Sequence, residues 1–190
     1  IHVNLAKGFR GGERQTELLI KALSKHFDVR QVVACREDSP LRHRLNNVTN
    51  VQFLTINHQL DGHFSAPTVD IVHAHEAKAV HWAYIHKILR TTPYILTRRV
   101  DTPIKEKWSN TVTYKNAFKR VGISTLIVDH IREKHWGKVE KIPDALAHLD
   151  SNPQEGEAFK ASFPNKTLIG HVGVLVDREK GQKVLIEVAS

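Results

Sequence analysis

The sequence has 190 residues, of which 41% are hydrophobic and 25% are charged, and its formal net charge is +8. This balance excludes an intrinsically disordered chain, and no apolar run approaches the roughly 18 residues of a membrane-spanning helix. The positive charge favours anionic partners such as nucleic acid, anionic lipid or phosphorylated substrates. Cys35 is the only cysteine and no signal peptide is visible, so we expect a cytoplasmic protein without an intrachain disulfide.

Apolar runs alternate with helical patterns along the first 146 residues. The runs that predict strands are rich in β-branched and other apolar residues; in chain order they are 1–6, 29–35, 48–56, 69–75, 92–100, 121–124 and the start of 137–146. Helices are predicted between them over 12–27, 41–47, 76–90, a segment that ends near Lys119 or Arg120, and 125–136. This alternation predicts an α/β fold, with a Rossmann-like parallel sheet and helices on both faces.

The first helical pattern has an apparent apolar face. Leu18, Leu19, Ala22 and Leu23 recur at helical spacing. We therefore expect these four side chains to pack the helix against the sheet.

The composition changes after residue 148, where LDSNPQEGE has the Pro, Gly, Asn and Ser content of a linker. We expect a first domain over residues 1–150, a linker over 151–165 and the truncated start of a second domain over 166–190. A strand at 166–176 and a helix from 179 should begin that second domain. The sequence contains no methionine, so we expect it to be part of a longer reading frame.

Gly11 and Gly12 follow the first predicted strand and open the first predicted helix. Glycines at this position let the backbone approach a ligand, and the amino end of a helix favours an anion. The segment KGFRGGE lacks the GxGxxG pattern of dinucleotide-binding proteins, and a simple tight turn is the alternative. Glu13 is expected in the first helical turn because of the helix dipole alone.

His73 and His75 end the fourth predicted strand, two residues apart, so their side chains should share one face. A shared face suits two metal ligands, a hydrogen-bonding pair in a sugar pocket, or a structural pair. Glu76, His81 and His86 offer no recognisable third and fourth ligand, and we expect no metal.

Arg98 and Arg99 lie at the end of the fifth predicted strand, close to Asp101. Guanidinium groups bind phosphate and carboxylate well. Successive residues of a strand point in opposite directions, so only one of the two arginines should enter a cleft. Two solvated surface arginines are the alternative.

A basic stretch with aromatic residues covers residues 105–120. Its members are Lys105, Lys107, Trp108, Tyr114, Lys115, Lys119 and Arg120. Such a stretch suits an anionic membrane surface, RNA whose bases stack on aromatic rings, or a solvated helix face.

Five segments, in this order and spacing, resemble family 4 glycosyltransferases of the GT-B fold. The segments are GGERQTELLIKAL, VDIVHAHEAKA, VGIS, KVEKIPDAL and LIGHVGVLVDREKGQKVLIEVA. Together they extend over almost the whole chain.

The resemblance implies two Rossmann-like domains, the first binding the acceptor and the second a nucleotide-sugar donor. It implies transfer with retention at the anomeric carbon, with no required metal and no cofactor besides the sugar nucleotide as substrate. Gly11 and Gly12 match the loop beside the donor diphosphate, and Glu13 follows them. His75 matches a cleft-lining position, Ser124 a serine after strand six, and Lys180 the lysine that neutralises the diphosphate.

The chain departs from the family pattern at several positions. Arg98 and Arg99 stand where many members carry a histidine that reaches the donor sugar, and they become catalytic candidates with His75. Val174 replaces an arginine, and Asp144 replaces an asparagine. The E-x7-E segment of the second domain is absent, so the chain alone is not expected to be active.

We therefore expect a glycosyltransferase that acts on a lipid-linked or glycan acceptor in bacterial lipopolysaccharide or surface polysaccharide synthesis. Its basic charge would bring a cytoplasmic enzyme to the anionic inner face of the plasma membrane. Two alternatives are a metal-dependent hydrolase centred on His73 and His75, and a basic nucleic-acid-binding module that uses residues 105–120.

Overall fold

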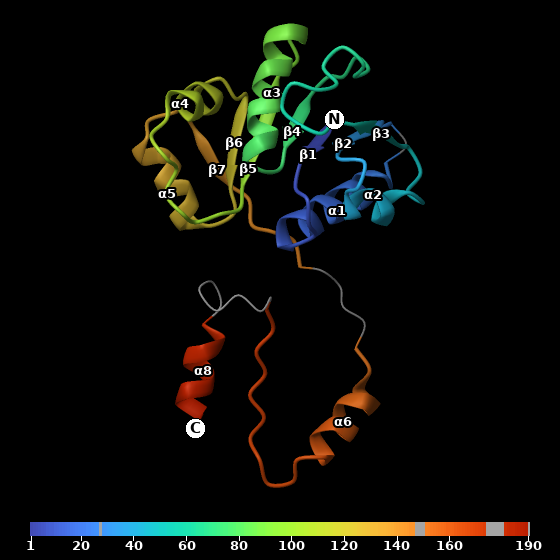
Figure 1. The fold of residues 1–190 in the computed structure, drawn as a ribbon, viewed down its shortest axis with the longest axis vertical. Coiled ribbons are helices and arrows are strands. Elements are labelled where there is room, and N and C mark those ends of the chain that lie inside the picture. Colours follow the sequence, from blue (N-terminus) through green and yellow to red (C-terminus); the bar gives the residue numbers. More distant parts are fainter. Residues whose placement is uncertain (27, 147–150, 174–180, 190) are drawn as a thin grey trace. The chain divides into compact units, whose positions relative to one another are not determined.

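The computed structural model describes residues 1–26, 28–146, 151–173 and 181–189 (Figure 1). Its contacts divide the chain into two compact units, Ile1–Ala147 and His148–Ser190. The first unit contains the whole sheet.

All seven strands of the first unit are parallel and form one sheet (Figure 1). They are β1 (His2–Asn4), β2 (Gln31–Cys35), β3 (Val51–Thr55), β4 (Val72–Ala74), β5 (Tyr94–Arg98), β6 (Lys119–Gly122) and β7 (Val139–Lys141). The order is β3-β2-β1-β4-β5-β6-β7, so the direction of winding reverses between β1 and β4. Open α/β sheets bind ligands at the carboxyl edge next to such a reversal.

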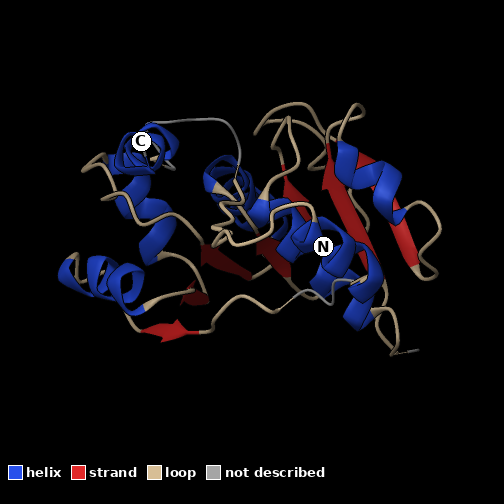
Figure 2. Cartoon of the chain, turned by 90° about the horizontal axis from the view of Figure 1, so that it is seen from below, coloured by secondary structure: helices blue, strands red, loops and turns tan. Residues whose placement is uncertain are grey.

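Helices cover both faces of the sheet, as the alternation of patterns predicted (Figure 2). The helices of the first unit are α1 (Gly11–Leu23), α2 (Pro40–Leu45), α3 (Ala77–Arg90), α4 (Trp108–Lys115) and α5 (Thr125–Glu133). The larger apolar cluster joins α3, α4 and α5 to one face. A smaller cluster, made by Ile20, Val33, Cys35, Leu41 and Leu45, joins α1 and α2 to the other. The α/β Rossmann-like fold is therefore confirmed.

The predicted apolar face of α1 is wrong. The buried residues of α1 are Glu13, Thr16, Glu17 and Ile20, while the predicted leucines are only partly buried and Ala22 is exposed. The sheet surface beneath α1 is partly polar, since the buried Gln31 donates a hydrogen bond to the carbonyl of Ile20 at 3.0 Å and Asn4 donates one to Glu13 at 3.3 Å. Polar side chains of α1 face these polar groups of the sheet. The apolar pattern alone therefore predicted the wrong buried face for this helix.

The second unit contains α6 (Pro153–Ala161) and α8 (Gln182–Ala189). The predicted linker 151–165 contains α6, which begins where the Asn152 side chain accepts hydrogen bonds from the backbone N–H groups of Gln154 and Glu155. The described part of the predicted strand, 166–173, is not a strand, and the described residues of this unit offer it no partner strand. Lys180 and Val174 lie outside the described residues.

Along the part of the chain that the structure describes, every helix is too short or too polar to cross a lipid bilayer.

Candidate functional site

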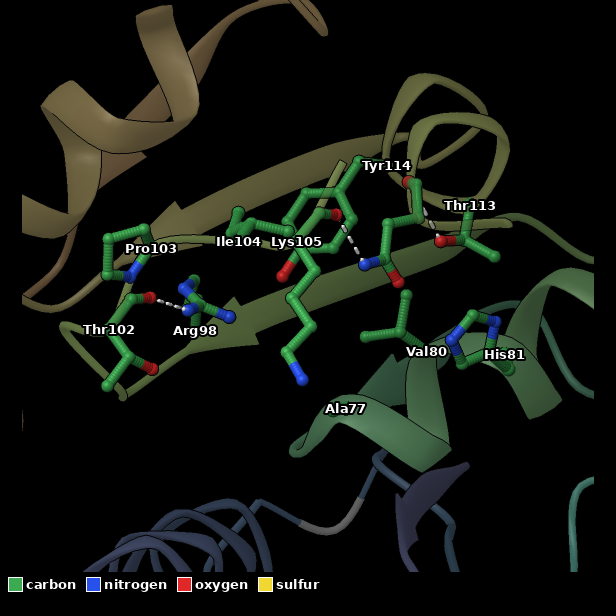
Figure 3. Close-up of a pocket in the computed structure, with 11 residues that line it drawn as sticks. Ala77, Val80, His81, Arg98, Thr102, Pro103, Ile104, Lys105, Thr113 and Tyr114 are labelled. Carbon is green, nitrogen blue, oxygen red and sulfur yellow. Dashed lines mark hydrogen bonds between the residues drawn. The ribbon is translucent and has the colours of Figure 1, made fainter. Parts of the chain in front are cut away.

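Two adjoining cavities lie at the carboxyl edge of the sheet. The larger, about 250 Å³, is bordered by Arg10 and Gly12 after β1, His75 and Glu76 after β4, and Arg98 and Arg99 at the end of β5. The smaller, about 210 Å³, lies over the amino end of α3 (Figure 3). Because β1 and β4 flank the reversal of winding, the larger cavity occupies the position where this class of sheet binds ligands.

The glycine turn leaves open space at this edge. A Cβ atom added to Gly11 would meet no described heavy atom within 4 Å, and one added to Gly12 would meet only the Cδ of Arg99, at 3.9 Å. Of the two, Gly12 borders the larger cavity and Gly11 does not. Neither glycine is required by contacts within the described protein, so the open space beside α1 is available to a ligand.

Glu13 borders the larger cavity, but both of its carboxylate oxygens are engaged by the protein. Oε2 accepts a hydrogen bond from the backbone N–H of Arg10 at 2.9 Å, and Oε1 accepts one from Nδ2 of Asn4 at 3.3 Å. Asn4 also accepts a hydrogen bond from the backbone N–H of Ala6 at 3.0 Å. These bonds hold the turn after β1 in one conformation, a role that the dipole argument for Glu13 did not include.

Glu76, whose only predicted role was that of a possible metal ligand, fixes the neighbouring turn. Its carboxylate accepts backbone N–H bonds from Leu5 at 3.2 Å, from Lys78 at 2.6 Å and from Ala79 at 2.8 Å. Burial raises the pKa of Glu76, and the three N–H donors oppose that rise. One side chain therefore caps α3 and ties it to the end of β1.

His73 and His75 do share one face of β4, and His2 of β1 joins them. Nδ1 of His2 lies 3.1 Å from Nε2 of His75, and Nε2 of His73 lies 2.8 Å from the Thr97 hydroxyl. The rings of His73 and His75 have centroids 4.0 Å apart. His2 was not predicted to join this group, because it lies far from His73 in the chain and only the pairing of β1 with β4 brings the two together.

Burial keeps these three histidines neutral. It lowers the pKa of His2 to about 3 and that of His73 to about 4, the latter with help from the positive charge of Arg99. Burial also places the pKa of His75 well below its usual range. Nδ1 of His75 is buried and has no hydrogen-bond partner among the described residues.

Three neutral imidazoles are a possible metal-binding group. One nitrogen from each of His2, His73 and His75 lies within 4.8 Å of the others. Zn–N bonds of about 2.0–2.1 Å place two ligand nitrogens roughly 3.3 Å apart, so the His2–His75 pair fits such a centre. No carboxylate or thiol of the described chain joins the group, and the nearby Arg99 opposes a cation.

The prediction that only one arginine enters the cleft is wrong, since both Arg98 and Arg99 border the larger cavity. The reason is that β5 ends at Arg98, so strand alternation no longer applies at Arg99. Arg99 pairs with Asp144 at 3.1 Å and donates to the His75 carbonyl at 3.4 Å. Arg98 donates to the Thr102 carbonyl, and its buried Nε has no partner within the described residues.

Ser124 borders neither cavity of the described residues. It is the N-cap of α5, where its hydroxyl accepts a hydrogen bond from the backbone N–H of Ile127 at 3.3 Å. Its predicted part in binding stays a prediction, as does that of Lys180.

The basic stretch 105–120 does not form one continuous surface. Tyr114 and Arg120 are buried, and Arg120 donates hydrogen bonds to the carbonyls of Tyr114 and Lys115, both at 2.6 Å. Lys105, Lys107 and Trp108 remain exposed. The stretch is therefore partly a structural link between α4 and β6, which weakens the nucleic-acid alternative.

Comparison with solved structures finds the same fold in Anabaena Alr3699/HepE. Its complexes with UDP and glucose, with UDP, and with UDP-glucose match at TM-scores of 0.75, 0.75 and 0.76 and at 16%, 16% and 15% sequence identity. Each match covers 99% of this chain and 56% of that protein, so the chain spans about half its length. No protein-family profile and no curated protein sequence matches. At such identity the likeness concerns the fold.

Proposed function

We propose that the protein is a glycosyltransferase with a nucleotide-sugar donor, and that its first unit forms the acceptor side. The observation that carries the proposal is the larger cavity, which gathers a glycine turn, a neutral histidine and two arginines at the reversal of winding. The fold shared with a protein crystallised with UDP-glucose supports a nucleotide sugar as the anion.

The reaction forms a bond from the anomeric carbon to an acceptor oxygen and breaks the bond from that carbon to the diphosphate. The nucleoside diphosphate leaves with the electron pair of the broken bond and takes up the proton that the acceptor hydroxyl loses. In this proposal Arg99 stabilises the charge that develops on the diphosphate, and Arg98 adds to it from the wall that the two cavities share. Gly11 and Gly12 leave room for it beside the amino end of α1, and His75 lines the larger cavity as an uncharged side chain.

The further details of the proposal rest on the family resemblance. They are retention at the anomeric carbon, independence of metal and cofactor, and Lys180 as a further positive charge on the diphosphate. They also include a lipid-linked or glycan acceptor in the synthesis of bacterial lipopolysaccharide or surface polysaccharide. The net charge of +8 supports action at the anionic inner face of the membrane.

Nucleotide binding by the full-length protein tests the proposal. In a thermal-shift series with UDP, GDP, ADP and their sugar conjugates, one nucleotide should stabilise the protein selectively, since a ligand that binds only the folded state raises stability. Arg99→Gln should then lower transfer by about 10²–10³-fold. Arg36→Gln, a matched change outside both cavities, should leave transfer unchanged. A protein that binds none of these nucleotides at millimolar concentration is not such an enzyme.

A second candidate is metal-dependent hydrolysis centred on His73 and His75. The observation that favours it is the approach of His2, which completes a group of three imidazoles. Metal analysis of the purified full-length protein separates the two candidates. Stoichiometric zinc, iron or manganese that disappears in a His2→Asn variant would favour the hydrolase, whereas nucleotide binding by metal-free protein favours the transferase.

A further inference from the structure

The smaller cavity differs from the larger one in its charge. We propose that it binds an oxyanionic group, phosphate or carboxylate, carried by the acceptor. The inference rests on the proposed function for the identity of the ligand as an acceptor. The recognition of an oxyanion follows from the cavity itself and from the side chains of Arg98 and Lys105.

The cavity contains positive charge without a balancing carboxylate. Arg98 and Lys105 border it, whereas no Asp or Glu is among the described residues that do. Figure 3 shows the Lys105 side chain extending into the space between Arg98 and the amino end of α3. The nearest acidic neighbour in sequence, Glu106, already pairs with Lys134. A negatively charged group of a ligand would balance the positive charges of Arg98 and Lys105.

Both cations keep hydrogen-bonding capacity for a ligand. The ammonium of Lys105 makes no hydrogen bond or ion pair with the described part of the protein. Arg98 donates to the Thr102 carbonyl, but its Nε is buried and finds no acceptor there. A buried guanidinium N–H without an acceptor is costly, and a phosphate or carboxylate oxygen is the acceptor that guanidinium groups bind best.

The lysine is held in place through its backbone rather than through its side chain. Nδ2 of Asn110 donates to the Lys105 carbonyl at 2.9 Å, and the Thr113 hydroxyl donates to the Asn110 carbonyl at 3.1 Å. This arrangement fixes the chain at Lys105 and leaves the ammonium free to turn toward a ligand.

The position of the cavity fits an acceptor. It shares Ala77, Val80, Arg98 and Tyr114 with the larger cavity, so a group bound in one lies next to a group bound in the other. Val80, Ile104 and Tyr114 give it an apolar wall beside the cations. Such a mixture suits a sugar that bears one charged substituent, with the uncharged part directed toward the site of transfer.

Three simple probes test the inference on the full-length protein without nucleotide. Glucose 6-phosphate, glucuronate and glucose differ in charge on a common sugar frame, and saturation-transfer NMR at constant ionic strength measures their dissociation constants. We expect at least one charged sugar to bind about five- to tenfold more tightly than glucose. The tighter of the two identifies the oxyanion as phosphate or carboxylate.

Two lysines of one loop provide the matched variants. Lys105→Gln should weaken the charged sugars about five- to tenfold, whereas Lys107→Gln, an equal change of charge outside both cavities, should leave them within about twofold. Equal binding of all three sugars, or equal loss in both variants, overturns the inference. Charged-sugar binding that depends on Lys105 in a protein that binds no nucleotide would overturn the proposed function and support the anion site.

Discussion

Acid should destabilise the first unit because its sheet buries neutral histidines. In the unfolded chain a histidine has a pKa near 6.5, whereas burial holds His2 at about 3 and His73 at about 4. Below pH 6.5 the unfolded state therefore binds protons that the folded state does not, and stability falls as pH falls. From pH 7 to pH 5 each of these histidines contributes a loss of about 2 kcal/mol. Together they account for about 4 kcal/mol, and His75 adds to the loss in the same direction.

Urea unfolding at pH 7 and pH 5, in the presence of EDTA, measures this loss. Tryptophan fluorescence reports on the first unit, since Trp82 and Trp136 are buried in its apolar cluster. His73→Gln should reduce the pH-dependent loss by about 2 kcal/mol, while His43→Gln, which removes an exposed imidazole of α2, should not reduce it. The reasoning is refuted if the native protein loses less than about 1 kcal/mol, or if His73→Gln loses as much as the native protein.

Three further predictions concern the turns around the larger cavity. Gly11→Ala should leave stability unchanged or slightly raised, because the added methyl meets no described atom within 4 Å. The same change should lower the transfer rate about tenfold if the diphosphate lies against this turn, whereas an unchanged rate would place the diphosphate elsewhere. Glu76→Ala removes the acceptor of three backbone N–H groups and should cost about 1–2 kcal/mol in urea unfolding, whereas a cost near zero would show that water replaces it. Asp144→Asn should change stability by less than about 1 kcal/mol, because its ion pair with Arg99 is partly exposed, and should keep transfer within a few-fold; a large loss would make the carboxylate itself functional.

The parallel sheet and the location of the site were predictable from local patterns. Buried parallel strands read as continuous apolar runs, and the polar residues His75 and Arg98 stand at the ends of two of these runs. Because the carboxyl ends of parallel strands lie along one edge of the sheet, residues at these ends are expected to be close together. The strand order then decides which of these residues are direct neighbours, because it places β4 beside β1.

The polar interior was not predictable in the same way. Apolar residues at helical spacing predict an apolar buried face for α1, but Glu17 is buried and forms ion pairs with Arg14 at 2.9 Å and Lys21 at 2.7 Å. His2 and His75 are separated by 73 positions, and their 3.1 Å contact depends on the register of β1 against β4. A local sequence pattern does not specify the register between strands that are distant in the chain. The histidine cluster and its low pKa values therefore could be found only from the folded structure.

The neutral histidines also decide how activity should depend on pH. The pKa of His75 lies well below 6.5, so this side chain should keep its neutral form as the pH falls through 6.5. Any acid loss of transfer should then follow unfolding rather than protonation of a catalytic group. Parallel measurements of transfer rate and tryptophan fluorescence against pH should give coincident acid limbs. A limb with its midpoint near pH 6.5 in protein that is still folded would mean that a histidine titrates in the site, and that the burial of His75 does not keep it neutral during turnover.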